Sequence, residues 1–491
     1  MRRIVAVATL LIVSCSAPST PTAVVSPSPT VAPSRDSPRP TASESPSGPV
    51  SAGTVPDIGL LFFYDFGGAP DAAQNAVTPA VYRYDGASGT LAKMDGWFSF
   101  AVGHETAAGV YVQGPNGRMD FMRWDGSRAS DQEFTACQQE PGLFASWCSV
   151  SATGVGVGYG SHTGPGPGPF TGPWCPAAFI RLPGTARGTS FPPELCVQSA
   201  SVSADGKQIL INDVAPRPSP TAFVGGRCQP GYVTFDNTTC YERRAWIMPV
   251  GGAPRQLRLA PATADLFLGS LSPDGRFAIG SQAGELVRVD VATGTTAALG
   301  PVDRTASLRW SAGGGLAFVR GAGDDSWIDR TVVVVAEDGS ARDMRFARSD
   351  WAIGLAPAWD PSGRRLAWIA SPAGVAGAAG AAQDYLDGRG VGDRRVLVSD
   401  LTSDPLEIRC GDGVAEGVRW SRDATALLLV CRRPGIRAAA FDLWLHRLGA
   451  PGAASVPVVR GITWGGVDAH GFAPDLLLLA AWSRGVTAAS P

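Results

Sequence analysis

The clearest pattern in the sequence is a repeat of two short apolar runs joined by a tight polar turn. Residues 270–294, SLSPDGRFAIGSQAGELVRVDVATG, contain such a pair around Pro-Asp-Gly, and a second glycine-containing turn follows. The same arrangement recurs at 201–213, 307–321, 357–371 and 417–431. Runs of this length bounded by Asp, Ser and Gly are typical of β-hairpins, because glycine tolerates the positive φ that such turns require. Each segment is therefore predicted to form a strand, a turn and a strand.

A second hairpin pattern accompanies the first. It appears as VYRYDGASG at 81–89, FMRWDGS at 121–127, LVRVDVATG at 286–294 and VVVVAEDGS at 332–340. Two hairpins make a unit of four strands, which we name a to d. Four-stranded units that repeat along a chain cannot bury their faces alone and do so by stacking radially. The predicted fold is therefore all-β, a β-propeller of four-stranded blades.

The number of repeats predicts the number of blades. Sets of strands begin near residues 60, 107, 149, 201, 270, 307, 357 and 417. We expect eight blades, with seven as the alternative. The fragment GFAPDLLLLAAW at 471–482 has no c and d strands after it, so it is expected to complete the first blade and close the ring.

The a–b turns resemble those of a known repeat. Ser272-Pro273-Asp274-Gly275 in particular is similar to the turn of the TolB-type, WD-like propeller repeat. The resemblance covers most of residues 56–485 and is strongest in the second half. It implies a fold and no activity, since such propellers serve as partner-binding platforms and as substrate-gating domains of serine peptidases. Asp205-Gly206 and Asp274-Gly275 are carried over from it as turn formers only.

Composition agrees with strands and turns. The 491 residues include 61 Gly and 40 Pro, with 44% hydrophobic and 17% charged residues, so long helices are not expected. The formal net charge of -2 gives no basic footprint for phosphate backbones. Nucleic acid is therefore not predicted as a partner.

The first fifteen residues, MRRIVAVATLLIVSC, read as an export signal. Two arginines precede the apolar run Ile4–Val13, which is too short to span a bilayer. The run ends in Ile-Val-Ser-Cys, which resembles the bacterial lipobox. This resemblance predicts lipidation of Cys15 and a lipoprotein anchored to the cell membrane on its extracytoplasmic face. The alternative is an ordinary secretory signal in which Cys15 is incidental.

Residues 16–55 are rich in Ser, Pro, Thr and Ala and contain few bulky apolar side chains. Such a segment cannot bury enough surface to offset its ordering entropy, so a disordered linker is predicted. At about 3.1 Å per residue in polyproline II, it would reach up to about 120 Å. The propeller is expected over 56–485, and 486–491 form a C-terminal tail.

Eight cysteines remain after Cys15, and an even number in an exported protein indicates disulfides. Eight cysteines allow 105 pairings, and nearest neighbours in sequence give Cys137 with Cys148, Cys175 with Cys196, Cys228 with Cys240, and Cys410 with Cys431. None forms C-x-x-C, so a zinc site is disfavoured. In propeller topology, all eight fall near d–a or b–c connections. These connections share one face of the ring, which we call the top face.

Long insertions are expected on the same face, at 161–174, 215–240, 321–330 and 372–395. Long loops on a compact scaffold frequently carry function. Large aromatic side chains dominate binding hot spots, so the candidate binding residues are those of the insertions: Phe170, Trp174, Phe223, Tyr232, Phe235 and Trp327. The alternative is that these rings pack only against their own loops.

No catalytic motif is present in the sequence. The four histidines, at 104, 162, 446 and 470, are scattered, and no G-x-S-x-G or H-E-x-x-H occurs. Acidic residues cluster at 324, 325 and 329 and at 384 and 387, without the spacing of an EF-hand. Neither a metal nor a cofactor is therefore predicted.

Two functions remain open. The first is a monomeric, non-catalytic binding or scaffold module that presents its top-face loops to a protein or glycan of the cell envelope. The alternative is a propeller enzyme, a hydrolase acting on glycosides or lactones, with its active site at the central channel. Three or more Asp, Glu or His side chains that meet at one channel mouth would favour the enzyme.

Overall fold

The computed structural model divides the chain into two compact units, Met1–Ser43 and Glu44–Pro491. The residues that it describes all lie in the second unit, at 48–65, 80–94, 99–105, 109–113, 119–124, 127, 138–140, 143–144, 147–151, 153–160, 175, 177–215, 217–219, 221–234, 239–259, 266–282, 285–301, 308–320, 331–336, 339–343, 351–372, 394–411, 413–433, 440–449, 454–463 and 480–482. No helix within these ranges has the length and apolar character needed to cross a bilayer.

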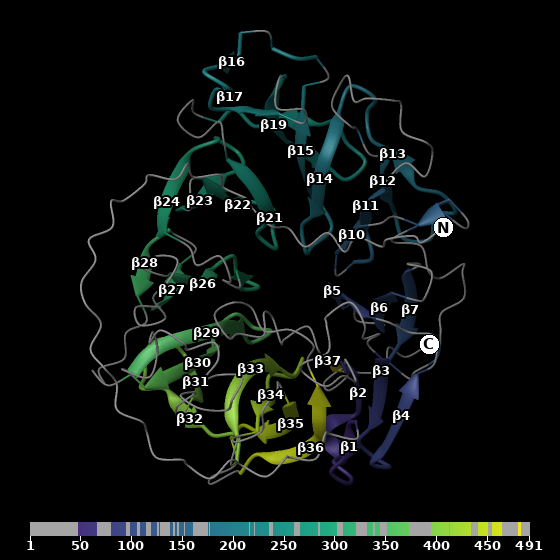
Figure 1. Ribbon diagram of the computed structural model, residues 1–491, viewed down its shortest axis with the longest axis vertical. Coiled ribbons are helices and arrows are strands. Elements are labelled where there is room, and N and C mark those ends of the chain that lie inside the picture. The colour runs from purple at the N-terminus through teal and green to yellow at the C-terminus, as the bar shows by residue number, and fades with distance from the viewer. Residues whose placement is uncertain are drawn as a thin grey trace, which may run out of the picture. The chain divides into compact units, whose positions relative to one another are not determined.

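Antiparallel sheets follow one another along the chain (Figure 1). Sheet 1 contains β37 (Ala480–Trp482), β2 (Leu60–Asp65), β3 (Ala80–Asp85) and β4 (Thr90–Met94). Sheet 2 contains β5 (Ser99–Glu105), β6 (Gly109–Gln113) and β7 (Met119–Arg123). Sheet 3 contains β10 (Trp147–Val150), β11 (Gly156–Gly160), β12 (Ala177–Arg181) and β13 (Thr189–Ser190). Sheet 4 contains β14 (Cys196–Val202), β15 (Gln208–Val214), β19 (Cys240–Pro249) and β18 (Tyr232–Thr234), and β20 (Arg255–Gln256) also pairs with β19.

The second half of the chain repeats this order with greater regularity. Sheet 5 contains β21 (Phe267–Leu271), β22 (Phe277–Gln282), β23 (Glu285–Asp290) and β24 (Thr296–Pro301). Sheet 6 contains β25 (Arg309–Trp310), β26 (Leu316–Arg320), β27 (Thr331–Val335) and β28 (Ala341–Asp343). Sheet 7 contains β29 (Trp351–Trp359), β30 (Leu366–Pro372), β31 (Arg395–Ser399) and β32 (Leu406–Ile408). Sheet 8 contains β33 (Val414–Trp420), β34 (Ala426–Arg432), β35 (Ala440–Arg447) and β36 (Val456–Thr463), with β1 (Val50–Ser51) at its edge.

The core lies between neighbouring sheets. Apolar residues of consecutive sheets form shared clusters, so that sheet 3 packs on 4, 4 on 5, 5 on 6, 6 on 7 and 7 on 8. One further cluster joins sheet 8 to sheet 1 and sheet 1 to sheet 2, and β5 of sheet 2 contacts β10 of sheet 3. Four-stranded antiparallel sheets that each pack face to face on the next are the defining arrangement of a β-propeller. The predicted fold is confirmed at this level.

Tryptophan side chains link the sheets of the second half. The indole N–H of Trp310 donates to the hydroxyl of Ser270 at 3.1 Å, across sheets 6 and 5. Trp359 repeats this link to the carbonyl of Arg309 at 3.0 Å, and Trp420 repeats it to the carbonyl of Ala358 at 2.8 Å. Each tryptophan stands at the end of strand a and bonds to strand a of the preceding sheet. The repeat therefore carries its own hydrogen bond to the sheet before it.

The a–b turns are built around a buried serine. In the turn after β21, the Ser272 hydroxyl donates to the Asp274 carboxylate at 2.7 Å and accepts from the Phe277 backbone N–H at 2.9 Å. Gly275 has φ +73, and a Cβ there would lie 2.6 Å from the Gln208 side chain of sheet 4. Glycine is thus required twice, for the backbone conformation and for the close approach of two sheets.

Each end of the described chain joins the sheet formed mainly by the other end. β37 pairs with β2, with Leu61 opposite Trp482, so residues 480–482 of the predicted closing fragment complete sheet 1. β1 pairs with β36 in sheet 8, although Val50 lies in the range predicted as linker. The open edge of β36 explains this strand, because it supplies backbone hydrogen bonds to a segment with little sequence signal of its own.

Candidate functional site

Disulfides gather at one end of the strands. Cys175 is bonded to Cys196, Cys228 to Cys240 and Cys410 to Cys431, as nearest-neighbour pairing predicts. Cys148 is also disulfide-bonded, and its predicted partner, Cys137, lies outside the described residues. All seven described cysteines lie where strand a begins, strand b ends or strand c begins, or in the connections there. Because neighbouring strands are antiparallel, the start of strand a, the end of strand b and the start of strand c lie at the same end of each sheet.

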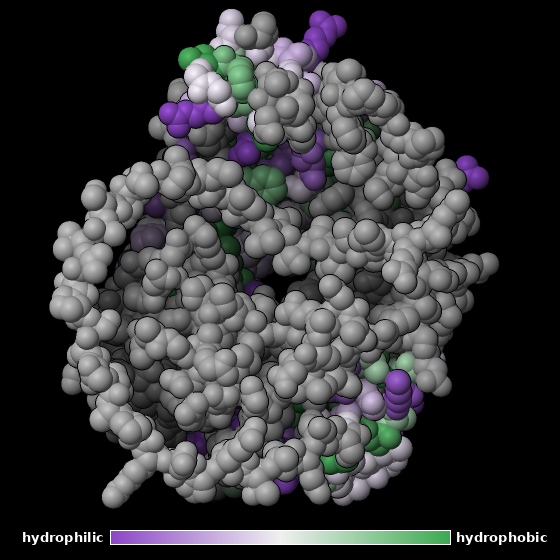
Figure 2. Space-filling view, in the orientation of Figure 1, coloured by the Kyte–Doolittle hydropathy of each residue, from purple (hydrophilic) through white to green (hydrophobic). Residues whose placement is uncertain are grey.

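The described part of the insertion at 215–240 lies at this end of sheet 4. A small hairpin, β16 (Phe223–Val224) and β17 (Arg227–Cys228), turns through Gly225 and Gly226, both at positive φ. The hairpin is held to the start of β19 by the Cys228–Cys240 disulfide. Figure 2 shows apolar and hydrophilic residues next to one another in this region, and Val224 at the turn is 56% exposed.

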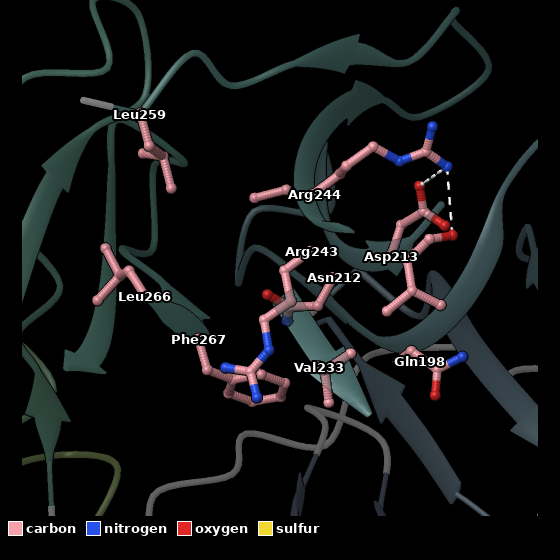
Figure 3. Close-up of a pocket in the computed structure, with 11 residues that line it drawn as sticks. Gln198, Asn212, Asp213, Val233, Arg243, Arg244, Leu259, Leu266 and Phe267 are labelled. Carbon is pink, nitrogen blue, oxygen red and sulfur yellow. Dashed lines mark hydrogen bonds and ion pairs between the residues drawn. The ribbon is translucent and has the colours of Figure 1, made fainter. Parts of the chain in front are cut away.

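A mostly apolar pocket lies between sheets 4 and 5, at the end of the sheets that carries the insertion (Figure 3). Its volume is about 190 Å³, and we call it the apolar pocket. Strands of both sheets and the insertion contribute to its lining: Gln198, Asn212, Asp213, Val214, Val233, Arg243, Arg244, Ala245, Leu259, Leu266 and Phe267. Six of these residues have apolar side chains, so the pocket favours an apolar group.

Asp213 forms the polar wall of the apolar pocket. Its carboxylate accepts hydrogen bonds from the Cys196 backbone N–H at 2.7 Å and the Trp246 indole N–H at 2.9 Å, and it pairs with the Arg244 guanidinium at 2.6 Å. Burial raises the pKa of Asp213 above its ordinary value, and the Arg244 charge and the hydrogen bonds partly offset this rise. The carboxylate is therefore already occupied by protein donors.

Asn212 fixes the neighbouring wall by joining the two sheets. Its amide donates to the Ser199 hydroxyl at 2.8 Å and to the Leu268 carbonyl at 2.7 Å. The Leu268 backbone N–H donates in turn to the Asn212 side-chain oxygen at 3.2 Å. These bonds hold sheet 5 against sheet 4 where the apolar pocket opens, so the pocket is preformed.

A second, more open pocket adjoins the first. It has a volume of about 510 Å³ and lies between the β16–β17 hairpin and β18. We call it the basic pocket, because its described lining residues include arginines and none of them is acidic: Val224, Arg227, Cys228, Gln229, Pro230, Tyr232 and Arg243. Arg243 lines both pockets. The two pockets therefore share one wall residue, in β19.

Two of the predicted binding aromatics are described, and both lie in this insertion. Tyr232 lines the basic pocket, and Phe223 pairs with Cys228 in the hairpin, each half-buried. Phe170, Trp174, Phe235 and Trp327 lie outside the described residues, as do the acidic clusters and most of the other three insertions. Within the described part of the chain, His, Cys, Asp and Glu form no group of three that is arranged to hold a metal ion.

Sequence reasoning missed most of the pocket residues. Arg227, Arg243, Leu266 and Phe267 carry no motif, and they come from separate segments of the chain. A signal did exist at 209–213, where the run Ile-Leu-Ile-Asn-Asp ends a buried strand in two polar residues. Polar side chains at the end of a buried strand need partners, and here those partners form the wall of the apolar pocket.

No family model matches the chain, and no curated protein is detectably similar to it in sequence. Among solved structures, the β-propeller domain of the Trilobed protease from Pyrococcus furiosus is 12% identical, with a TM-score of 0.33, over 65% of this chain and 84% of that one. The tricorn protease is 14% identical, with a TM-score of 0.31, over 78% of this chain and 42% of that one. An acylaminoacyl peptidase from Pyrococcus horikoshii is 11% identical, with a TM-score of 0.37, over 75% and 53%. At this level the similarity concerns the fold alone and assigns neither activity nor partner.

Proposed function

We propose that the protein is a lipid-anchored, extracytoplasmic binding module with a propeller of eight blades. Cys15 would carry the lipid, the Ser- and Pro-rich segment would act as a tether, and the top-face loops would bind a protein or glycan of the cell envelope. Sheets 1 to 8 supply the eight blades, and the apolar cluster shared by sheets 8, 1 and 2 supports closure of the ring.

One observation carries the binding function: the described residues of the insertion at 215–240 form a hairpin and a strand, and they help to line two pockets. Its Cys228–Cys240 disulfide closes a loop of 12 residues, and such a bridge stabilises by about 2 to 4 kcal/mol. The Cys175–Cys196 and Cys410–Cys431 disulfides lie at the corresponding end of sheets 3 and 4 and of sheets 7 and 8. Structural reinforcement of loops that contribute little to the inter-sheet core is expected where the loops bind a partner.

Shortening the insertion tests this function. Residues 215–242 are replaced by a tight turn, which removes Cys228 and Cys240 together and leaves no unpaired thiol. The sheets should remain folded, because loop length affects stability only logarithmically. Capture of partners from an envelope extract should fall. The control is Asp274→Asn, in the a–b turn between β21 and β22 at the opposite end of the strands. Thermal melting is measured for both proteins. Undiminished capture by the shortened protein, with loss in the control, would contradict the proposal.

The anchor is tested separately with Cys15→Ser. Acyl chains contribute about 0.8 kcal/mol of membrane affinity per buried CH₂, so the serine variant should leave the membrane fraction. Fractionation before and after a high-salt wash measures this. A variant that still sediments with membranes after the wash would refute lipid anchoring and leave the binding function standing.

A further inference from the structure

We propose that the apolar and basic pockets form one docking site for an acidic protein segment that carries a bulky apolar side chain. The apolar side chain would enter the pocket between sheets 4 and 5, and flanking carboxylates would face the arginines of the basic pocket. This inference rests on the proposed binding function and names the chemistry of its partner.

The apolar pocket suits a side chain of the size of Leu or Phe. Its volume is about 190 Å³. Leu266 lines it and is 4% exposed, while Leu259, Phe267 and Val233 are half-buried around it. Half-buried apolar side chains around a preformed hollow gain further burial when an apolar group enters, which favours binding. The anchor of the partner is therefore apolar.

The charges around the pockets select acidic flanks. Among the described lining residues, three arginines, Arg227, Arg243 and Arg244, face one carboxylate, that of Asp213. That carboxylate is 2.6 Å from Arg244 and accepts two N–H groups, so it is fully engaged. The side chain of Arg227 is exposed and makes no hydrogen bond or ion pair with any described residue. Arginine recognises carboxylates through paired N–H donors.

The polar groups of the apolar pocket favour an apolar side chain over a sugar. A sugar needs side-chain donors and acceptors that are free to bind its hydroxyls. The Asn212 amide donates to Ser199 and Leu268, and the Asp213 carboxylate is occupied by protein donors. The apolar pocket therefore offers apolar contact beside the positive charge of the basic pocket, and together they match an acidic segment with one apolar anchor.

The test uses the oxidised, full-length exported protein in detergent and a panel of fluorescent peptides. The probe is acetyl-Ser-Asp-Asp-X-Asp-Ser-amide, in which X is Leu, Phe or Trp, and binding is read as fluorescence anisotropy up to 1 mM peptide. At least one probe should bind. Replacing X by Ser, or the three Asp by Asn, should weaken binding at least tenfold, and raising the salt should weaken the acidic probe alone.

Two protein variants locate the site. Arg227→Glu should weaken the probe at least tenfold, and its exposure makes misfolding no concern. Phe267→Ala should weaken it through the apolar pocket, with melting checked. Arg276→Glu, whose side chain is 53% exposed in the turn after β21, is the matched charge control and should bind normally.

Several outcomes would overturn this inference. They are no binding by any probe up to 1 mM, equal binding by the Asn peptide, unchanged binding to Arg227→Glu, and binding of polygalacturonate in place of the peptides. The insertion-shortening experiment keeps the two proposals apart. If shortening still abolishes capture while every peptide fails, the binding function stands and only the acidic, apolar class of partner is wrong.

Discussion

Asn212→Ala should be among the most destabilising single substitutions between sheets 4 and 5. The side chain is 8% exposed and makes three hydrogen bonds, two of them with the backbone of Leu268 in β21. Leu268 is itself 1% exposed. The substitution thus leaves a backbone N–H and a carbonyl buried without partners, in addition to removing the bond to Ser199.

The magnitude follows from those two orphaned groups. A buried donor or acceptor left unpaired costs about 1 to 3 kcal/mol, so two cost about 2 to 6 kcal/mol. Asn212 also lines the apolar pocket, and a water that enters there could satisfy one group. We therefore expect a loss near the lower end, about 2 to 4 kcal/mol. Ser199→Ala removes only one acceptor from the network and should cost about 0.5 to 1.5 kcal/mol.

Urea unfolding followed by tryptophan fluorescence measures both variants against the parent protein. The comparison requires equal m-values, since a changed slope would signal partial unfolding of a few sheets. Asn212→Asp adds a check on mechanism. An ionised carboxylate would face the Leu268 carbonyl, so this variant should be less stable at pH 7 than at pH 4, relative to Asn212→Ala. A loss below about 1 kcal/mol for Asn212→Ala would refute the reasoning.

Three further predictions follow from the inter-sheet contacts. Trp420→Phe should cost about 1 kcal/mol more than Trp444→Phe, because Trp420 loses its indole N–H bond to the Ala358 carbonyl of the preceding sheet, whereas the Trp444 indole makes no such bond to a described residue; urea midpoints measure the difference. Burial lowers the pKa of His446 below its ordinary value. Stability is therefore complete above about pH 6.5 and is lost as the pH falls below that value, because the unfolded chain then takes up a proton more readily than the folded protein. His446→Gln should make the melting temperature less dependent on pH between about pH 7 and 5. Gly275→Ala should destabilise more than Gly226→Ala, because both have positive φ and only the first crowds the preceding sheet, as differential scanning calorimetry can show.

Local chemistry explains why the repeated strands were predictable. In the unit that begins at 270, the turn residues Pro-Asp-Gly require a reversal, and the apolar runs on either side of it became β21 and β22. The nearest-neighbour disulfides were predictable for the same reason, because short loops keep their ends close. Neither inference depends on contacts between distant sheets.

Contacts between distant segments explain what could not be predicted. β1 forms because β36 offers an open edge, and Val50-Ser51 carry no strand signal in a Ser- and Pro-rich context. The pockets depend on which side chains of sheets 4 and 5 face one another, and Arg243 and Leu266 acquire their places only when the sheets pack. Single residues without a motif become a site through tertiary packing.

The pairing of β37 with β2 sets a time order on folding. Phe62 lies opposite Ala481, so the edge of β2 stays without this partner until almost the whole chain has been synthesised. At about 5 to 20 residues per second, that interval is tens of seconds. An apolar strand edge left open for so long is a site for pairing with other chains. Sheet 1 can therefore be completed only after β37 has been synthesised, and the other pairings of β2 must hold its sheet together until then.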